Sequence, residues 1–132
     1  MSLKAIYNYD FLQMSNADSF YGTFFAKTLN LAELKIIHDH VQQSSINFAG
    51  LNIPAAIYLK SNKENNTRPF VVLAQLHGNE PAGLAGIALA MALAEAKLLK
   101  RDVIGIIGNP LAAKQYFAAW EKNPTTPQET RD

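Results

Sequence analysis

The stretch Phe70-Val-Val-Leu-Ala-Gln-Leu-His-Gly-Asn-Glu-Pro81 decides the fold of this chain. Its apolar run from Phe70 to Leu76 is typical of a strand that is buried on both faces in the middle of a parallel sheet. The run stops at a turn sequence, and Pro81 then suits the first position of a helix, because its missing N–H costs nothing there. We therefore expect His77 and Glu80 together at the carboxyl end of a central strand, where open α/β sheets bind their ligands.

Downstream of this stretch, the sequence alternates between helix and strand patterns. A helix is predicted from about Pro81 to Lys100, a second buried strand from Val103 to Ile107, and a further helix from Leu111 to Glu121. This order predicts a βαβα unit with parallel strands and a right-handed crossover. The turn at Asn109 should then open on the same edge of the sheet as His77.

Upstream, the clearest predicted element is a helix over residues 30–43. Asn30 is a good N-cap, and Glu33 stands where a capping box requires an acid. His38 and His40 lie on this helix, but residues two apart point in different directions and cannot share a metal ion. We expect both to be ordinary, partly exposed histidines.

The other upstream segments are less regular. The first residues are rich in aromatic side chains and are expected to pack on the core, with a strand at 4–9 and a helix at 18–29. Residues 46–60 look extended, and Pro54 predicts an edge position or a bulge because it cannot donate to a sheet ladder. The polar residues 61–67 predict a hairpin connection into the central strand.

Composition and charge exclude several classes of function. The 132 residues are 48% hydrophobic and 17% charged, as is ordinary for one globular domain. A net charge of +1 without a basic cluster gives no attraction to nucleic acid or to an anionic membrane. The absence of cysteine excludes disulfides, cysteine-bound zinc and thiol catalysis, and it is compatible with a reducing compartment. We expect a cytoplasmic protein with no signal peptide and no membrane span.

The spacing of His77 and Glu80 suits a metal site. Zinc in hydrolases takes nitrogen from histidine and oxygen from carboxylates, with three protein ligands and one position left for water. An imidazole at the strand end and a carboxylate in the first turn of the helix can converge on one ion, whose bound water becomes a nucleophile. The alternative is structural: Glu80 is a favourable acid at a helix N-terminus and His77 only ends a strand. A non-catalytic α/β module that works through a partner surface therefore stays open.

Two motifs stand at the ends of the predicted parallel strands, Leu76-His-Gly-Asn-Glu-Pro-Ala-Gly83 and Gly108-Asn-Pro-Leu-Ala-Ala-Lys-Gln115. Together they resemble the succinylglutamate desuccinylase/aspartoacylase family, zinc amidohydrolases related to the zinc carboxypeptidases. The resemblance implies a zinc-dependent deacylase that hydrolyses the amide bond of an N-acyl amino acid or a similar small molecule. It also implies a three-layer α-β-α fold with a mixed, partly parallel sheet, and His77 and Glu80 as the first two zinc ligands.

The family requires further residues that this sequence does not supply. Its second histidine ligand and its glutamate general base come from well downstream, so no catalytic base is assigned in this chain. By the resemblance, Arg131 is a candidate for the arginine that polarises the scissile carbonyl, although it follows an apparent insertion. Asn109 is the other candidate substrate-binding residue. Two zinc ligands alone should bind metal weakly and give little turnover.

We therefore expect residues 1–132 to be the N-terminal part of a single zinc-hydrolase domain. Residues 1–45 form an aromatic and helical lead-in, residues 46–122 carry the sheet with its βαβα unit, and residues 123–132 form a loop. A zinc carboxypeptidase or peptide amidase is the alternative within enzymes. Those more usually carry an Asn-Pro-Asp-Gly turn, whereas Asn109-Pro-Leu-Ala112 fits the deacylases better. The oligomeric state is left open.

Overall fold

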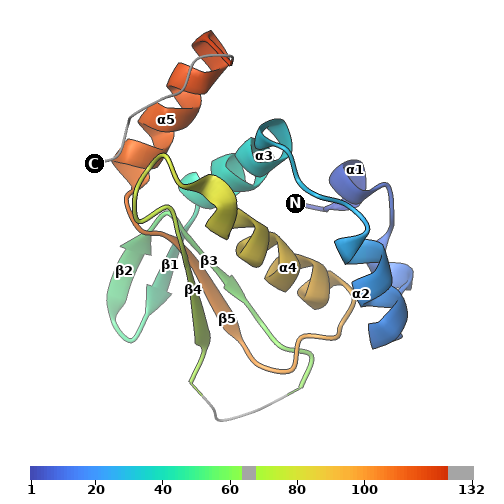
Figure 1. The fold of residues 1–132 in the computed structure, drawn as a ribbon. Coiled ribbons are helices and arrows are strands. Elements are labelled where there is room, and N and C mark those ends of the chain that lie inside the picture. Colours follow the sequence, from blue (N-terminus) through green and yellow to red (C-terminus); the bar gives the residue numbers. More distant parts are fainter. Residues whose placement is uncertain (64–67, 125–132) are drawn as a thin grey trace.

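The computed structural model describes residues 1–63 and 68–124. They form a mixed α/β structure in which helices cover one face of a small sheet (Figure 1). The elements are α1 (Lys4–Tyr7), η1 (Phe11–Gln13), α2 (Ala17–Phe25), α3 (Leu31–Gln42), β1 (Ser45–Phe48), β2 (Leu51–Pro54), β3 (Ala56–Leu59), β4 (Phe70–Ala74), η2 (Pro81–Gly83), α4 (Leu84–Glu95), β5 (Val103–Ile107) and α5 (Pro110–Lys122).

The main sheet has three strands in the order β3-β5-β4. β4 and β5 are parallel, with Phe70 opposite Val103 and Ala74 opposite Ile107, and α4 connects them. The predicted β4–α4–β5 unit is thus confirmed, as is the strand over Val103–Ile107. β3 pairs with the other side of β5 in the antiparallel direction, which makes the sheet mixed.

The prediction that the strand beginning at Phe70 is central and buried on both faces is wrong. In the described part of the chain β4 is an edge strand, and Phe70, Val71 and Leu73 are 57%, 53% and 52% exposed. The central strand is β5, in which Val103, Ile104 and Ile107 are buried. An apolar run shows that a strand has apolar faces, but it does not show which strands lie beside it.

One face of the sheet is closed by α4, with α3 beside α4 on the same side (Figure 1). A Cβ at Gly105 of β5 would lie 3.2 Å from the Ile87 side chain, so the helix approaches this strand closely. Val72 also points to this side, toward Gly86 of α4. Because side chains alternate along a strand, Val71 and Leu73 point to the opposite face, where both are exposed.

The aromatic side chains of the N-terminal residues pack on one another and share one core cluster with α3 and α4, as expected. The ring centroids of Tyr7 and Phe24 are 4.9 Å apart, and those of Phe11 and Phe20 are 5.4 Å apart. The predicted strand at 4–9 is wrong, because this segment contains helix α1. Leu3, Ile6 and Tyr7 are all buried, and this spacing places them on one helical face rather than alternating across a strand.

Helix α3 begins as predicted. The Asn30 side chain accepts a hydrogen bond from the Glu33 backbone N–H at 2.9 Å, and the Glu33 carboxylate accepts one from the Asn30 N–H at 3.1 Å. The expectation of a partly exposed His38 is wrong, since α3 packs between α4 and α5 and buries that ring. His40 is partly buried, as expected.

The extended segment before the main sheet forms an antiparallel hairpin of β1 and β2, followed by β3. Pro54 pairs with Ser45 at the end of this two-stranded sheet, so its predicted edge position is confirmed. The predicted hairpin into β4 is wrong, because β5 lies between β3 and β4. Residues 64–67 of that connection lie outside the described residues. No helix within the described ranges is long and apolar enough to cross a bilayer.

Candidate metal site at the carboxyl end of β4

The turn after β4 presents the two predicted metal ligands. The His77 carbonyl accepts a hydrogen bond from the Glu80 backbone N–H at 3.1 Å, which closes the turn directly before η2. The His77 residue is half-buried and Glu80 is exposed. Their predicted place at the carboxyl end of a strand is therefore confirmed, although the strand lies at the edge of the described sheet.

The turn after β5 lies against the turn after β4. The Gly108 N–H donates to the Ala74 carbonyl at 2.7 Å, and the Asn109 N–H donates to the Gln75 carbonyl at 3.0 Å. The prediction that the two turns open on one edge of the sheet is thus confirmed. The Asn109 side-chain oxygen accepts from the Ala112 N–H at 3.2 Å and caps α5. Its role in substrate binding stays a prediction.

Two glycines let these segments approach. A Cβ at Gly83 would lie 3.1 Å from the Ala74 Cα, and a Cβ at Gly108 would lie 3.2 Å from the Leu76 Cα. Both distances are shorter than ordinary van der Waals contacts, and the opposing atoms belong to backbone that has little room to move. One glycine in each motif therefore brings η2 and the β5 turn onto the end of β4.

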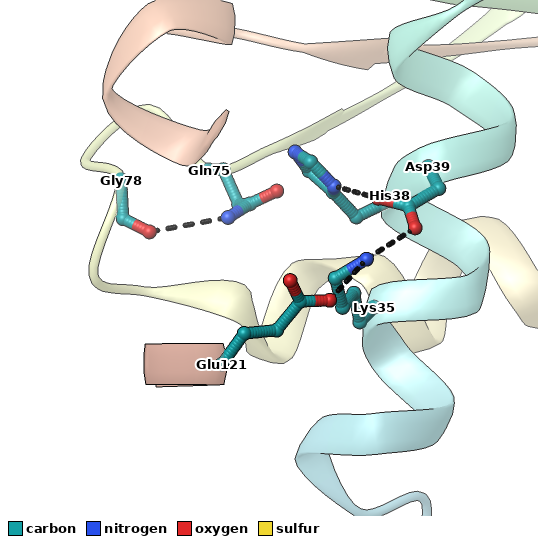
Figure 2. Close-up of polar contacts among 6 residues, drawn as sticks. All are labelled: Lys35, His38, Asp39, Gln75, Gly78 and Glu121. Atoms are coloured by element: carbon teal, nitrogen blue, oxygen red, sulfur yellow. Dashed lines mark hydrogen bonds and ion pairs between the residues drawn. The ribbon is translucent and has the colours of Figure 1, made fainter. Parts of the chain in front are cut away.

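Gln75 is a residue of this site that the sequence analysis missed. Its backbone is left-handed, with φ of 51°, and the residue is only 2% exposed. The side-chain Nε2 donates to the Gly78 carbonyl at 3.1 Å, inside the turn that carries His77 and Glu80 (Figure 2). Its Oε1 is buried without a hydrogen-bond partner among the described residues. The available signal was a polar residue within an otherwise apolar run.

His38 of α3 lies on the other side of Gln75 in the same view (Figure 2). Its Nδ1 is 2.9 Å from the Asp39 carboxylate, and its ring packs on Phe117 of α5 with centroids 4.6 Å apart. Burial lowers the pKa of His38, and the hydrogen bond to Asp39 opposes this shift only in part. His38 Nε2 is a second buried atom for which the described part of the chain offers no hydrogen-bond partner.

A charged network continues from Asp39 toward α5. Lys35 Nζ lies 2.6 Å from an Asp39 oxygen and 2.8 Å from a Glu121 oxygen. Burial alone would raise the pKa of Asp39, but the hydrogen bonds from Lys35 and His38 outweigh it and lower that pKa. Lys35 is correspondingly held in its charged form, because both carboxylates raise its pKa. The ring of His38 therefore has a carboxylate on its Nδ1 side.

The donors of the turn fit zinc in kind but not in number. His77 and Glu80 are two of the three protein ligands that a hydrolytic zinc site uses. Between them, the Asn79 side-chain oxygen is buried and finds no hydrogen-bond partner within the described residues. Residues 1–63 and 68–124 contain no group of three or more His, Cys, Asp or Glu side chains placed to hold one ion. Arg131 lies outside the described residues.

Comparisons of this chain with models of known protein families, with curated proteins and with solved structures gave no match.

Proposed function

We propose that this chain carries the first part of the active site of a zinc-dependent deacylase, similar to the succinylglutamate desuccinylase/aspartoacylase family. The observation that supports it best is the meeting of the His77–Glu80 turn and the Gly108–Asn109 turn at the carboxyl ends of two parallel strands. This is the position in which α/β sheets bind ligands. The substrate class is an amide such as an N-acyl amino acid.

In this proposal His77 and Glu80 hold the ion from one side, and the turn at Asn109 borders the substrate space. The bound zinc would supply a Lewis acid and a water that is acidic enough to act as a nucleophile near neutral pH. Gly83 lets η2, and Gly108 lets the turn after β5, approach the end of β4 closely, so the ligand pair would be held at a well-packed strand end. The third ligand, the general base and the arginine, for which Arg131 is the candidate, complete the chemistry.

We also propose that the sheet belongs to a larger three-layer arrangement of the zinc carboxypeptidase type. What supports this is the apolar face of the sheet opposite α4, on which Val71, Leu73 and Tyr58 are exposed. A contiguous apolar sheet face and an open strand edge are features that proteins usually cover. The same surface also favours the second candidate, a non-catalytic module that binds a partner there.

Zinc titration into the purified chain tests the proposal. We expect weak binding that is lost in His77→Ala and in Glu80→Ala, because each variant removes a direct ligand. The loss should exceed the roughly 10–100-fold that removing a residue hydrogen-bonded to a ligand costs. His40→Ala is the matched control, since His40 lies on α3 and is not one of the predicted ligands, and it should bind zinc like the unaltered chain.

Equal zinc affinity in all four proteins would exclude the site and leave the binding-module candidate. If the ligand variants do lose zinc, activity separates the enzyme classes. A form of the protein that also supplies the third ligand and base should then hydrolyse N-acyl amino acids in preference to short peptides. The opposite preference would favour a carboxypeptidase or peptide amidase.

A further inference from the structure

The outer edge of β4 is an unpaired strand edge in the described part of the chain. The Phe70 N–H donates to a carbonyl just before β5, and the Ala74 carbonyl accepts from an N–H just after β5. Because backbone groups alternate in direction along a strand, the N–H and C=O groups of Val71 and Leu73 point away from β5. On that outer side they have no backbone partner among the described residues.

The sequence of this edge does not prevent another strand from pairing with it. Natural edge strands are usually protected by a charge, a proline or a bulge, but Phe70–Ala74 carries no charge and no proline and pairs with β5 without a bulge. Phe70, Val71 and Leu73 are all more than half exposed. Pro69 directly before the strand has no N–H to donate, so a partner strand would pair with residues 70–74.

We infer that β4 pairs in the antiparallel direction with β4 of a second copy of this chain, about a two-fold axis at Val72. In this register Val71 lies opposite Leu73 of the second copy, and the two residues exchange both of their outward hydrogen bonds. Symmetry repeats this exchange on the other side of the axis. Val72 lies opposite Val72 of the second copy, in a pair without hydrogen bonds. The sheets of the two copies then form one continuous sheet.

A second copy in the antiparallel direction complements this edge in size and in charge. The register places the large, exposed Phe70 opposite the small Ala74 of the second copy. The start of β4 is basic, because Arg68 and Arg101 are exposed there and Arg101 Nε donates to the Arg68 carbonyl at 2.6 Å. The turn at the other end carries the exposed Glu80. Antiparallel pairing brings each basic start near the acidic end of the other copy, whereas parallel pairing would bring like charges together.

This pairing does not depend on zinc, so it goes beyond the proposed function and is tested on the metal-free chain by sedimentation over a series of concentrations. We expect a reversible dimer. Val71→Pro removes an outward N–H that the β4–β5 ladder does not use, and it should weaken the dimer by about tenfold or more. Val71→Thr is the matched control, since it keeps that N–H and should dimerise like the unaltered chain. Circular dichroism checks that both variants are folded.

Cross-linking tests the register itself, because the chain contains no cysteine of its own. In Val72→Cys the two cysteines face each other across the axis, about 4.5 Å apart between Cα atoms, which a disulfide can span. In Val71→Cys they are diagonal neighbours about 7–8 Å apart, which is too far. With oxidised glutathione we therefore expect about tenfold more linked dimer from Val72→Cys than from Val71→Cys.

The two cysteine positions differ in a way that makes this comparison strict. Val71 is exposed and Val72 is half-buried, so random collisions would link Val71→Cys first. That order of cross-linking would overturn the inference and indicate contact through the exposed face of the sheet. A chain that sediments as a monomer throughout the concentration series would also overturn it, as would a Val71→Pro variant that is folded and dimerises as well as Val71→Thr.

Discussion

At the scale of single residues, His38 makes the stability of the fold depend on pH. Burial lowers its pKa in the folded protein, whereas the unfolded chain restores the ordinary value of 6.5. Between these two values the unfolded chain binds more protons, so the free energy of unfolding falls as the pH drops through that window. His40 contributes in the same direction, since burial lowers its pKa as well.

Urea denaturation at pH 7.5 and at pH 5 should therefore show a lower free energy of unfolding at the acidic value. His38→Gln removes the titrating group, and the difference between the two pH values should shrink. His40→Gln is the matched control and should shrink it less, because His40 is only half-buried. A pH dependence that His38→Gln leaves unchanged would show that another group is responsible.

Single residues also differ in how far their roles could be predicted from the sequence. Asn30 was predictable as a cap, because its partner Glu33 is three residues away in the chain. His77 and Glu80 were predictable in place, because a strand end and a helix start bracket them. Gln75, directly after β4, and His38, on α3, were not, since it is tertiary packing that buries both side chains. A histidine on a helix looks ordinary in a sequence, and the available signal at Gln75 was a polar residue in an apolar run.

At the scale of elements, glycine determines how closely β4 meets its neighbours. A methyl group at Gly83 would press on the Ala74 backbone, and one at Gly108 on Leu73 and the Leu76 backbone. Gly83→Ala and Gly108→Ala should each destabilise the protein by about 1–3 kcal/mol, the usual cost of overpacking. Gly22→Ala in α2 is the control: no atom lies within 4 Å of the added Cβ, so it should stabilise by about 0.5–1 kcal/mol. Thermal unfolding of the three variants measures these differences, and a neutral Gly108→Ala would contradict the close approach.

The periodicity of apolar residues predicted the helices and strands themselves better than the order of the strands in the sheet. The β4–α4–β5 unit and α5 follow from apolar runs broken by Asn and Pro turns, and a helical crossover between two strands of one sheet makes those strands parallel. The position of β4 at the edge does not follow, because Phe70–Ala74 is as apolar as Val103–Ile107. β5 is central because β3 pairs with its other side through backbone hydrogen bonds, and no side-chain pattern encodes that pairing.

At the scale of the whole molecule, the sheet is covered unequally. Helices α3 and α4 close one face (Figure 1). The N-terminal aromatic cluster extends the same core. On the other face Val71 and Leu73 of β4 and Tyr58 of β3 are exposed. Substitutions at β5 and in the helical layer should therefore lower the free energy of unfolding most. The outer side of β4 should tolerate polar substitution.

One substitution made at two valines tests this asymmetry. Val71→Thr and Val103→Thr change the same side chain on neighbouring parallel strands, but Val71 is 53% exposed and Val103 is 6% exposed. We expect Val71→Thr to change the free energy of unfolding by less than about 0.5 kcal/mol, as at ordinary surface sites. Val103→Thr buries a hydroxyl and should cost about 1–3 kcal/mol. Urea denaturation of both variants gives the comparison. Equal costs would mean that the outer face of β4 is covered in solution, and sedimentation of the unaltered chain would show whether a second copy of the chain covers it.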